Sequence, residues 1–245
     1  MASPSTQTVI NRYYPFLLEI RKRFLFAGSI FVIAVIVGFF SYQKIITLVL
    51  RFFSLPGIKI NIVFTTPFQF FTLALNCGLV MGASITIPVV IFQLLSFLKP
   101  ALHKKEYRIL VNVLPLALVL FFLGFGYGIL CMRYLLQLFY RTSISLQIGN
   151  VLDIEKFLSN ILLTGLLMGL AFLFPIIMTV VMLLNLVKIS FFEKRRIYAY
   201  LVAVLFVILL PPPDLISDIV LFTPLVILFE LTLLLNRIFL KKSPS

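Results

Sequence analysis

Carboxylates offer the clearest chemistry in this sequence, because the 245-residue chain holds only eight acidic residues. Two of them, Glu19 and Glu106, stand in short segments that are otherwise basic. They could form a pocket for a cationic peptide, since bidentate carboxylate–guanidinium bonds combine strength with defined geometry. The alternatives are an i,i+4 salt bridge from Glu19 to Arg23 and a solvated Glu106 beside Lys105 and Arg108. Spacing alone leaves both interpretations open.

Three further acidic residues lie in or beside the last apolar run. Glu230 is inside that run, where an ionisable group is costly and commonly functional. Its structural alternative is a snorkelling pair with Arg237, seven residues further on. Asp214 follows three prolines and is well placed to cap the next helix. Asp218 is one turn later on the same face, where like charges repel, so we expect either a protonated carboxyl or a cation from elsewhere.

The motifs of several catalytic classes are missing from the sequence. It contains no G-x-x-x-x-G-K-[ST], G-x-S-x-G or H-E-x-x-H pattern. His103 is the one histidine, and it stands beside two lysines with no nucleophile close to it in the sequence. Cys77 and Cys131 lie inside apolar runs and are expected to be buried thiols without metal-ligand spacing. We therefore expect no enzyme activity, metal or other cofactor. Because the chain has no P-loop for ATP hydrolysis, the energy for any transport would have to come from a gradient or a partner.

Six long apolar runs must position these side chains, and they divide the chain into seven polar segments. Hydrophobic residues make up 62% of the chain, against roughly half in soluble domains. Fifteen of the 21 lysines and arginines fall in the first, third, fifth and seventh segments. Basic loops stay in the cytoplasm, so we predict an all-α integral membrane protein with six spans and cytoplasmic termini. The predicted spans cover about residues 24–42, 68–98, 109–132, 157–187, 197–210 and 215–235, in a domain of residues 12–240 between a disordered tail (1–11) and a short C-terminal tail (241–245).

Details of these runs carry predictions of their own. The second and fourth are much longer than the ~30 Å hydrocarbon core and contain Pro88 and Pro175, so tilt or a kink is expected. The fifth gives only roughly 21 Å of helix, so it either sits behind other helices or thins the bilayer, unless its boundaries are imprecise.

Residues from Tyr13 predict an amphipathic helix on the inner surface, and alternation over residues 58–64 predicts a short extended piece. The net charge of +13 lies mostly in short loops, where topology and anionic lipids explain it without nucleic acid.

Four segments, taken in order, carry a family resemblance. Residues 16–23 (FLLEIRKR) are similar to an H-L-x-E-L-R-x-R opening. Residues 93–106 are similar to the pattern Q-x-W-x-F-x-x-P-[AG]-L-x-x-x-E, with Glu106 at its end. Residues 212–214 resemble a T-P-P-D turn, and residues 224–230 resemble P-x-x-x-[LY]-[FY]-E. Together they resemble TatC, the core receptor family of the twin-arginine protein translocase, over about residues 12–240 and with six spans in the same order.

The resemblance implies a concave bundle in the cell membrane that binds twin-arginine signal peptides of folded precursors at its cytoplasmic face. It also implies recruitment of single-span TatA- and TatB-like partners, self-association, and transport driven by the proton-motive force. By motif match, Glu19 and Glu106 become the signal-peptide carboxylates, and Arg21 and Arg23 belong to the same surface. The candidates for an intramembrane or partner-coupling role are Asp214, Asp218, Glu230, Gln69, Pro88 and Pro175.

Several positions depart from the family pattern. Phe16 replaces the opening His, Leu95 replaces the Trp, Gln69 stands at the Glu of an S-P-x-E motif, and Asp218 occupies a common Gln position. Leu173 sits where F-E-x-P places an intramembrane Glu, so any role of that carboxylate must be met differently here. The alternative function is a small-molecule or ion transporter, which would need paired polar groups within the spans. An intramembrane enzyme is a third class, and the chain offers no nucleophile–base or metal set for it.

Overall fold

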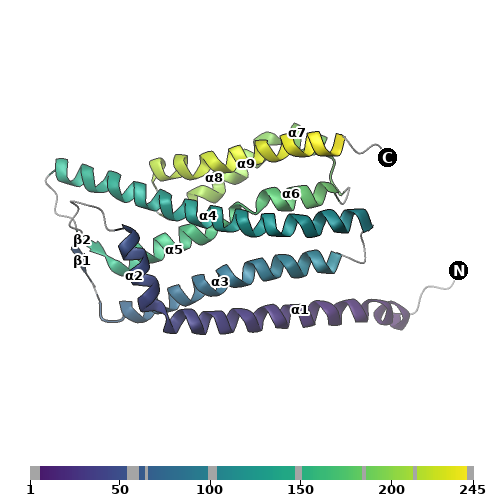
Figure 1. The fold of residues 1–245 in the computed structure, drawn as a ribbon, viewed down its shortest axis with the longest axis horizontal. Coiled ribbons are helices and arrows are strands. Elements are labelled where there is room, and N and C mark those ends of the chain that lie inside the picture. The colour runs from purple at the N-terminus through teal and green to yellow at the C-terminus, as the bar shows by residue number, and fades with distance from the viewer. Residues whose placement is uncertain are drawn as a thin grey trace.

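The computed structural model describes residues 6–53, 61–63, 66–98, 104–146, 151–183, 186–211 and 214–241. Within these ranges the chain forms an elongated bundle of helices (Figure 1). Two short strands lie at one end of it, β1 (Asn61–Val63) and β2 (Val151–Asp153). In chain order the helices are α1 (Thr6–Phe40), α2 (Tyr42–Phe53), α3 (Gln69–Leu98), α4 (Lys104–Ser145), α5 (Ile154–Ala171), α6 (Phe174–Leu183), α7 (Ile189–Lys194), α8 (Arg196–Ile208) and α9 (Leu215–Lys241).

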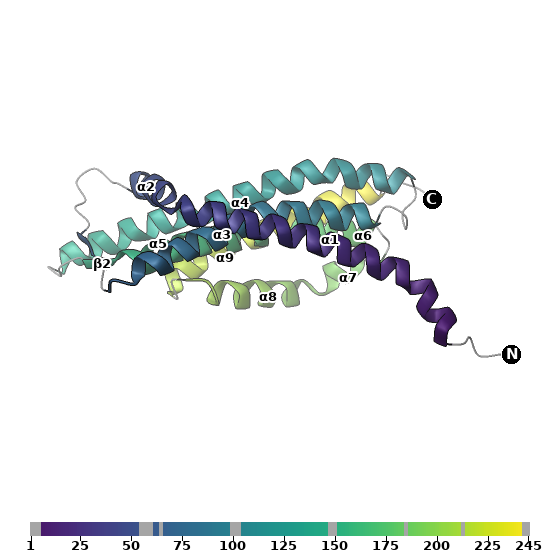
Figure 2. The same ribbon diagram turned by 90° about the horizontal axis from the view of Figure 1, so that it is seen from below.

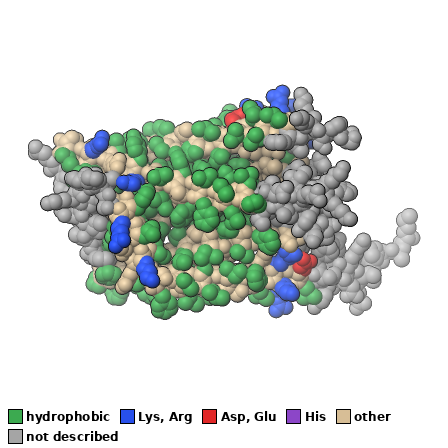
Figure 3. Space-filling view, viewed as in Figure 1, with side chains coloured by type: hydrophobic (Ala, Val, Ile, Leu, Met, Phe, Trp, Pro, Cys, Tyr) green, Lys and Arg blue, Asp and Glu red, His purple; other side chains and the backbone are tan. Residues whose placement is uncertain are grey.

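Five stretches of the described chain are long and apolar enough to cross a membrane, and α8 is a shorter apolar helix of 13 residues. Apolar side chains cover the middle of the visible face, whereas lysines and arginines gather toward its two ends (Figure 3). The protein is thus an all-α membrane protein with several spans, as the sequence predicts. The five stretches are Leu18–Phe40, Gln69–Leu94, Pro115–Ser145, Ile154–Met182 and Leu215–Ile238.

The helices run back and forth between two ends of the bundle (Figures 1 and 2). At one end, which we call the Glu19 end, α1, α4 and α8 begin and α9 finishes. At the opposite end, which we call the Asp153 end, α2 and the strands lie beside the start of α5. β1 and β2 pair in parallel, with Ile62 opposite Leu152. This pairing ties the segment after α2 to the entrance of α5, so it fixes one end of the bundle.

Two pairs of glycines let neighbouring helices approach closely. α1 packs along α3, and α4 packs along α5. A Cβ added at Gly38 would come within 2.9 Å of the Cα of Gly78, and one added at Gly128 would come within 2.8 Å of the Cα of Gly165. Small residues replace side-chain bulk with backbone contact, which is how helices associate in a medium as apolar as their own surfaces.

Pro88 and Pro175, the two prolines expected to kink the long second and fourth runs, have different consequences for their helices. α3 continues without interruption through Pro88. The long fourth run is divided, because α5 ends at Ala171 and α6 begins at Phe174, which makes Pro175 the second residue of α6. Proline is tolerated in the first turn of a helix, where its missing N–H would have had no partner. The chain therefore changes helix just before Pro175, near the middle of the fourth membrane stretch.

Two helices extend beyond the limits read from the sequence. α4 continues to Ser145, so much of the segment expected to be an outer loop from Arg133 is helical. Met132 and Leu135 are buried in the main hydrophobic core, which explains why the helix persists there. α1 already begins at Thr6, so it includes residues from the stretch expected to be a tail.

The sequence analysis missed helix α2 entirely. Its apolar residues follow helical spacing, and Val49 and Phe53 are buried in the main core. Phe53 also packs edge-on against Phe157 of α5, with ring centroids 5.4 Å apart. The signal was an i, i+4 pattern that the proline and glycine further along the segment obscured. The extended piece expected over residues 58–64 contains β1.

Candidate functional site

Glu19 stands on α1 at the Glu19 end and holds a guanidinium. Its Oε1 accepts hydrogen bonds from Nη2 of Arg23 at 2.6 Å and from Nε at 3.1 Å. The i,i+4 salt bridge is therefore formed, yet the Glu19 side chain remains 47% exposed. An exposed ion pair contributes little to stability, so this carboxylate can exchange one guanidinium for another at small cost.

Arg23 also links two helices. Its Nη1 donates a hydrogen bond to the backbone carbonyl of Gln93 on α3, at 2.7 Å. This arginine therefore positions the Glu19 carboxylate against α3 as well as neutralising it. Arg21, two residues earlier, is exposed on the same helix. The motif that the sequence singled out thus contains one arginine held by the protein itself and one on the surface.

Glu106 is the third residue of α4, which begins at the Glu19 end. Its side chain lies outside the part of the structure that is described. The backbone nonetheless places it at the same end of the bundle as Glu19, as the topology predicted from the sequence requires.

Glu230 pairs across helices, and its partners do not include Arg237, the structural alternative that the sequence offered. Its Oε2 accepts a hydrogen bond from Nη1 of Arg196 at 3.0 Å, and its Oε1 accepts one from the hydroxyl of Tyr200. Both partners belong to α8, which runs antiparallel to α9, whereas Arg237 is two turns further along α9 and is exposed. A residue seven positions away is roughly 10 Å distant along the helix axis, so the neighbouring helix supplies the nearer cation.

Arg196 and Tyr200 are functional candidates that the sequence analysis missed. They are four residues apart and therefore share one face of α8. This spacing places two polar side chains on one face at the start of an apolar run. Such a pair indicates a polar residue on a neighbouring helix with which it can form hydrogen bonds. The sequence alone could not identify Glu230, 30 residues or more away, as that partner.

Asp214 caps α9, as the sequence predicted. Its Oδ2 accepts the backbone N–H of Ser217 at 2.9 Å, and its Oδ1 accepts the Ser217 hydroxyl. Asp218 follows one turn later, and its Oδ1 is buried without a hydrogen-bond partner among the described residues. Neither aspartate forms an ion pair within the ranges that the structure describes. The like-charged pair is thus present, and the described residues supply no cation that relieves it.

Gln69 lies at the Asp153 end, far from Glu19. It is buried, and its Nε2 donates a hydrogen bond to Oδ2 of Asp153 at 2.7 Å. Asp153 also caps α5, since its Oδ1 accepts the N–H groups of Glu155 and Lys156. One carboxylate therefore joins the start of α3, strand β2 and the start of α5. In this structure Gln69 has a structural partner, and the role predicted for it in coupling to other proteins stays a prediction.

The position that the family pattern gives to an intramembrane Glu belongs to the core. Leu173 is 3% exposed and lies in the main hydrophobic cluster together with Phe172. Both residues form the junction between α5 and α6, and Phe174 separates them from Pro175. The side chain at this point packs against apolar neighbours, so it presents no charge to a ligand.

Polar contacts deep in the bundle connect helices that are distant in sequence. The buried hydroxyl of Thr164 on α5 donates to the carbonyl of Pro211 at 2.7 Å, and the Tyr127 hydroxyl on α4 donates to the carbonyl of Val220 at 2.7 Å. Asn236 on α9 donates to the Thr179 hydroxyl of α6 at 2.9 Å. Among the described residues no three His, Cys, Asp or Glu side chains group as metal ligands would.

The bundle and its charges define a class, namely a helical membrane protein of several spans with ionisable side chains placed mainly near its two ends. Residues 15–224 match the family described as Sec-independent protein translocase protein (TatC). The chain belongs to this TatC family. It is a component of the Sec-independent, twin-arginine translocase, and it is located in the cell membrane, as its bacterial relatives are. The family is one of translocase subunits and is not a family of enzymes.

Relatives from two bacteria align over most of their length. The Sec-independent protein translocase protein TatCy of Bacillus subtilis (strain 168) is 29% identical over 92% of this chain and 88% of its own. The Sec-independent protein translocase protein TatC of Escherichia coli (strain K12) is 26% identical over 99% of this chain and 93% of its own. A crystal structure of the twin-arginine translocase receptor TatC has the same fold, with a TM-score of 0.76 and 21% identity over 91% of this chain and 98% of that one.

Proposed function

We propose that this protein is the translocase subunit that recognises twin-arginine signal peptides, and that it does so at the Glu19 end. The observation that supports this most strongly is the exposed Glu19 carboxylate, which already accepts two N–H groups from one guanidinium. A signal-peptide arginine would replace Arg23 at Oε1 or occupy the exposed side of the same carboxylate. Glu106 would take the second arginine from the start of α4.

The surrounding charge makes this recognition selective. Arg21, Lys22 and Arg23 stand on the same helix, so a peptide with diffuse positive charge is repelled. Guanidinium groups in the right geometry overcome that repulsion, because each forms two parallel hydrogen bonds with a carboxylate and an ammonium forms a single directed contact. We therefore propose that arginine pairs bind and lysine pairs bind weakly. The Glu19 end then faces the cytoplasm, where folded precursors are found.

We further propose that the Asp153 end and the last spans couple the receptor to single-span TatA- and TatB-like partners, and that the proton-motive force drives transport. Support comes from Asp218, whose buried Oδ1 has no partner among the described residues, and from the short α8 beside α9. A polar donor on a partner helix could satisfy that oxygen. Self-association of the receptor belongs to the same proposal.

The test is site-specific crosslinking of a photoreactive signal peptide to the protein in membrane vesicles. The wild-type protein should be labelled near Glu19 and Glu106, and the double variant E19A/E106A should lose both the labelling and the export of a folded precursor. Glu193→Ala is the matched control, because it removes an acid at the same end on α7 outside the proposed pocket. Labelling and export that survive in the double variant would refute the proposed site. Equal labelling by a Lys-Lys peptide would refute the proposed selectivity.

A further inference from the structure

A groove of about 620 Å³ opens beside α8, and Tyr200, which donates to Glu230, is one of its lining residues. Its walls come from α6 to α9 and the end of α5, and they are mostly apolar, with Phe174, Ala203, Phe206 and Phe229 among them. The volume falls within the roughly 300–1,000 Å³ of ordinary ligand pockets. Because α8 is one of the apolar helices, the groove lies at the depth of the bilayer and must be filled by something apolar.

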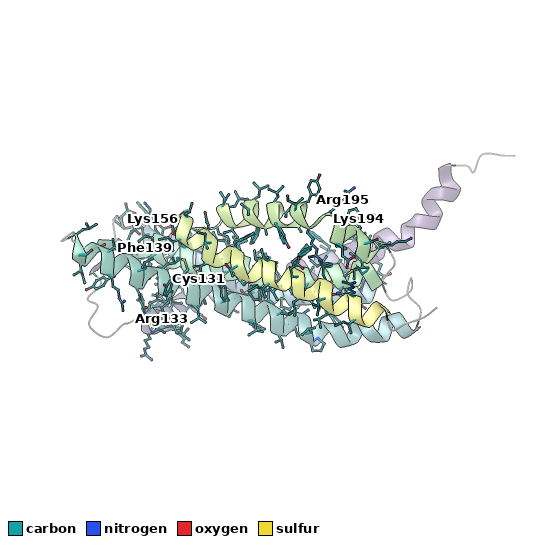
Figure 4. All side chains as sticks on the ribbon, turned by 90° about the horizontal axis from the view of Figure 1, so that it is seen from above. Cys131, Arg133, Phe139, Lys156, Lys194 and Arg195 are labelled. Atoms are coloured by element: carbon teal, nitrogen blue, oxygen red, sulfur yellow. The ribbon has the colours of Figure 1, made fainter. Side chains whose placement is uncertain are left out.

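Among the described residues that line this groove, Arg195 is the one with a charged side chain, and it lies at one extremity. It stands at the junction of α7 and α8, next to Lys194 (Figure 4). Its guanidinium lies over the ring of Phe191, 4.6 Å from the centroid, which helps to hold it in place. Arg196 is paired with Glu230, whereas no carboxylate of the described residues forms an ion pair with Arg195. The groove thus ends at a positive charge that lacks an acidic partner in this part of the chain.

Two further features suit an anion at that extremity. The N-terminus of α8 has no side-chain hydrogen bond at its cap. The N–H groups of Tyr198 and Ala199 already donate to the Arg195 carbonyl, so among the described residues those of Arg196 and Ile197 are the ones in this turn that are left for an anion. The residues from Lys188 to Arg196 include four basic side chains and one acidic one. Along α8 the groove runs from Arg195 to Phe206, which corresponds to roughly 16 Å of helix. That length is about half of the ~30 Å hydrocarbon core, hence the thickness of one leaflet.

We propose that this groove binds an anionic phospholipid of the leaflet at the Glu19 end. One acyl chain lies along α8 between the walls, and the phosphate is held by Arg195 and the first turn of α8. The charge at one extremity, the apolar walls and the single-leaflet length together match one lipid molecule. A transmembrane helix of a partner would cross both leaflets. It therefore matches less well a groove that combines a cation at the headgroup level with an apolar slot of one leaflet's length.

The chain contains no tryptophan, so a single introduced one gives an unambiguous fluorescence reporter. Phe206→Trp places it in the groove, and Leu205→Trp places it on a side chain that is exposed and does not line the groove. The full-length protein is reconstituted in phosphatidylcholine vesicles with a minor fraction of phosphatidylglycerol. Either the phosphatidylglycerol or an equal fraction of the phosphatidylcholine carries brominated acyl chains, which quench tryptophan on contact.

Brominated phosphatidylglycerol should quench F206W more than the same fraction of brominated phosphatidylcholine, and L205W should respond equally to the two. Adding Arg195→Gln should abolish that excess, whereas the neighbouring change Lys194→Gln should preserve it. Arg195→Lys should restore part of it, since the charge returns. Equal quenching of F206W by both lipids, or an excess that survives R195Q, overturns the proposal. Protection of F206W from both lipids would show that a protein segment fills the groove, which overturns it as well.

Discussion

The two ends of the bundle use carboxylates in opposite ways. At the Glu19 end, the Glu19 carboxylate is exposed and bound to an arginine side chain. At the Asp153 end, Asp153 and Asp214 accept backbone N–H groups at helix starts, and Gln69 donates to the first of them. An exposed ion pair exchanges easily, whereas a helix cap or a buried hydrogen bond from a side-chain amide is part of the fold. The difference teaches that an acidic residue is accessible to a ligand where it is exposed and its partner is a charged side chain, and not where its partner is a backbone N–H or a buried amide.

The first way to break this comparison is Glu19→Gln, which keeps the shape and removes the charge. We expect the affinity for a twin-arginine peptide to fall by about 1.5–3 kcal/mol, or roughly 10- to 100-fold, because a hydrogen bond to a charged group is lost. Thermal unfolding in detergent should change little, since the Glu19 side chain is 47% exposed. Titration of a labelled peptide measures the affinity. An unfolding transition that shifts as much as binding would place Glu19 among the structural carboxylates.

At the opposite end, Gln69→Glu restores the residue that the family motif carries there and should destabilise this chain. It sets two carboxylates at the distance where Gln69 now donates to Asp153. Loss of the hydrogen bond from the Gln69 amide lowers the unfolding free energy by about 1.5–3 kcal/mol. Repulsion between the two carboxylates lowers it further. Lowering the pH should reduce this loss of stability, because a proton shared between the two carboxyl groups can replace the amide N–H as the hydrogen-bond donor. Peptide affinity should stay unchanged, and Gln69→Leu serves as the comparison without repulsion.

Asp214→Ala removes the cap of α9 and should cost about 0.5–2 kcal/mol of stability, the usual range for such a residue. The N–H and the hydroxyl of Ser217 lose their acceptor together. Asp214→Asn should recover most of the loss, because asparagine caps nearly as well. Denaturant or thermal unfolding in detergent measures both. If D214A left stability unchanged while abolishing export, Asp214 would have to be grouped with Glu19.

The smallest expected effect is Asp218→Asn, and it has the opposite sign. A buried carboxylate oxygen that has no partner in the described part of the chain, one turn from another aspartate, destabilises the protein. Removing the charge should therefore raise the stability of the isolated protein by about 1 kcal/mol or less. The same change should weaken capture of a partner helix in membranes if the oxygen serves that contact. Co-purification of a tagged TatA- or TatB-like protein measures the second effect.

The sequence by itself determined the elements and the inventory of charges. Six apolar runs of helical length, the cap at Asp214 and the placement of Glu19 beside Arg23 follow from local spacing, because helix periodicity and capping act over only a few residues. Pro88 and Pro175 indicated where a helix would be disturbed, and of these two Pro175 lies at a break whereas Pro88 does not. The family pattern in the same residues indicated the translocase, and the match over residues 15–224 confirmed it.

Tertiary structure decided which of those charges are engaged. Glu230 finds Arg196 and Tyr200 because α8 runs antiparallel beside α9. Gln69 finds Asp153 across 84 residues because the two strands bring their helix starts together. Burial of Leu173 and the shape of the groove beside α8 likewise depend on how several helices pack. Partners this distant in sequence are chosen by packing geometry, and no local pattern of residues encodes that choice.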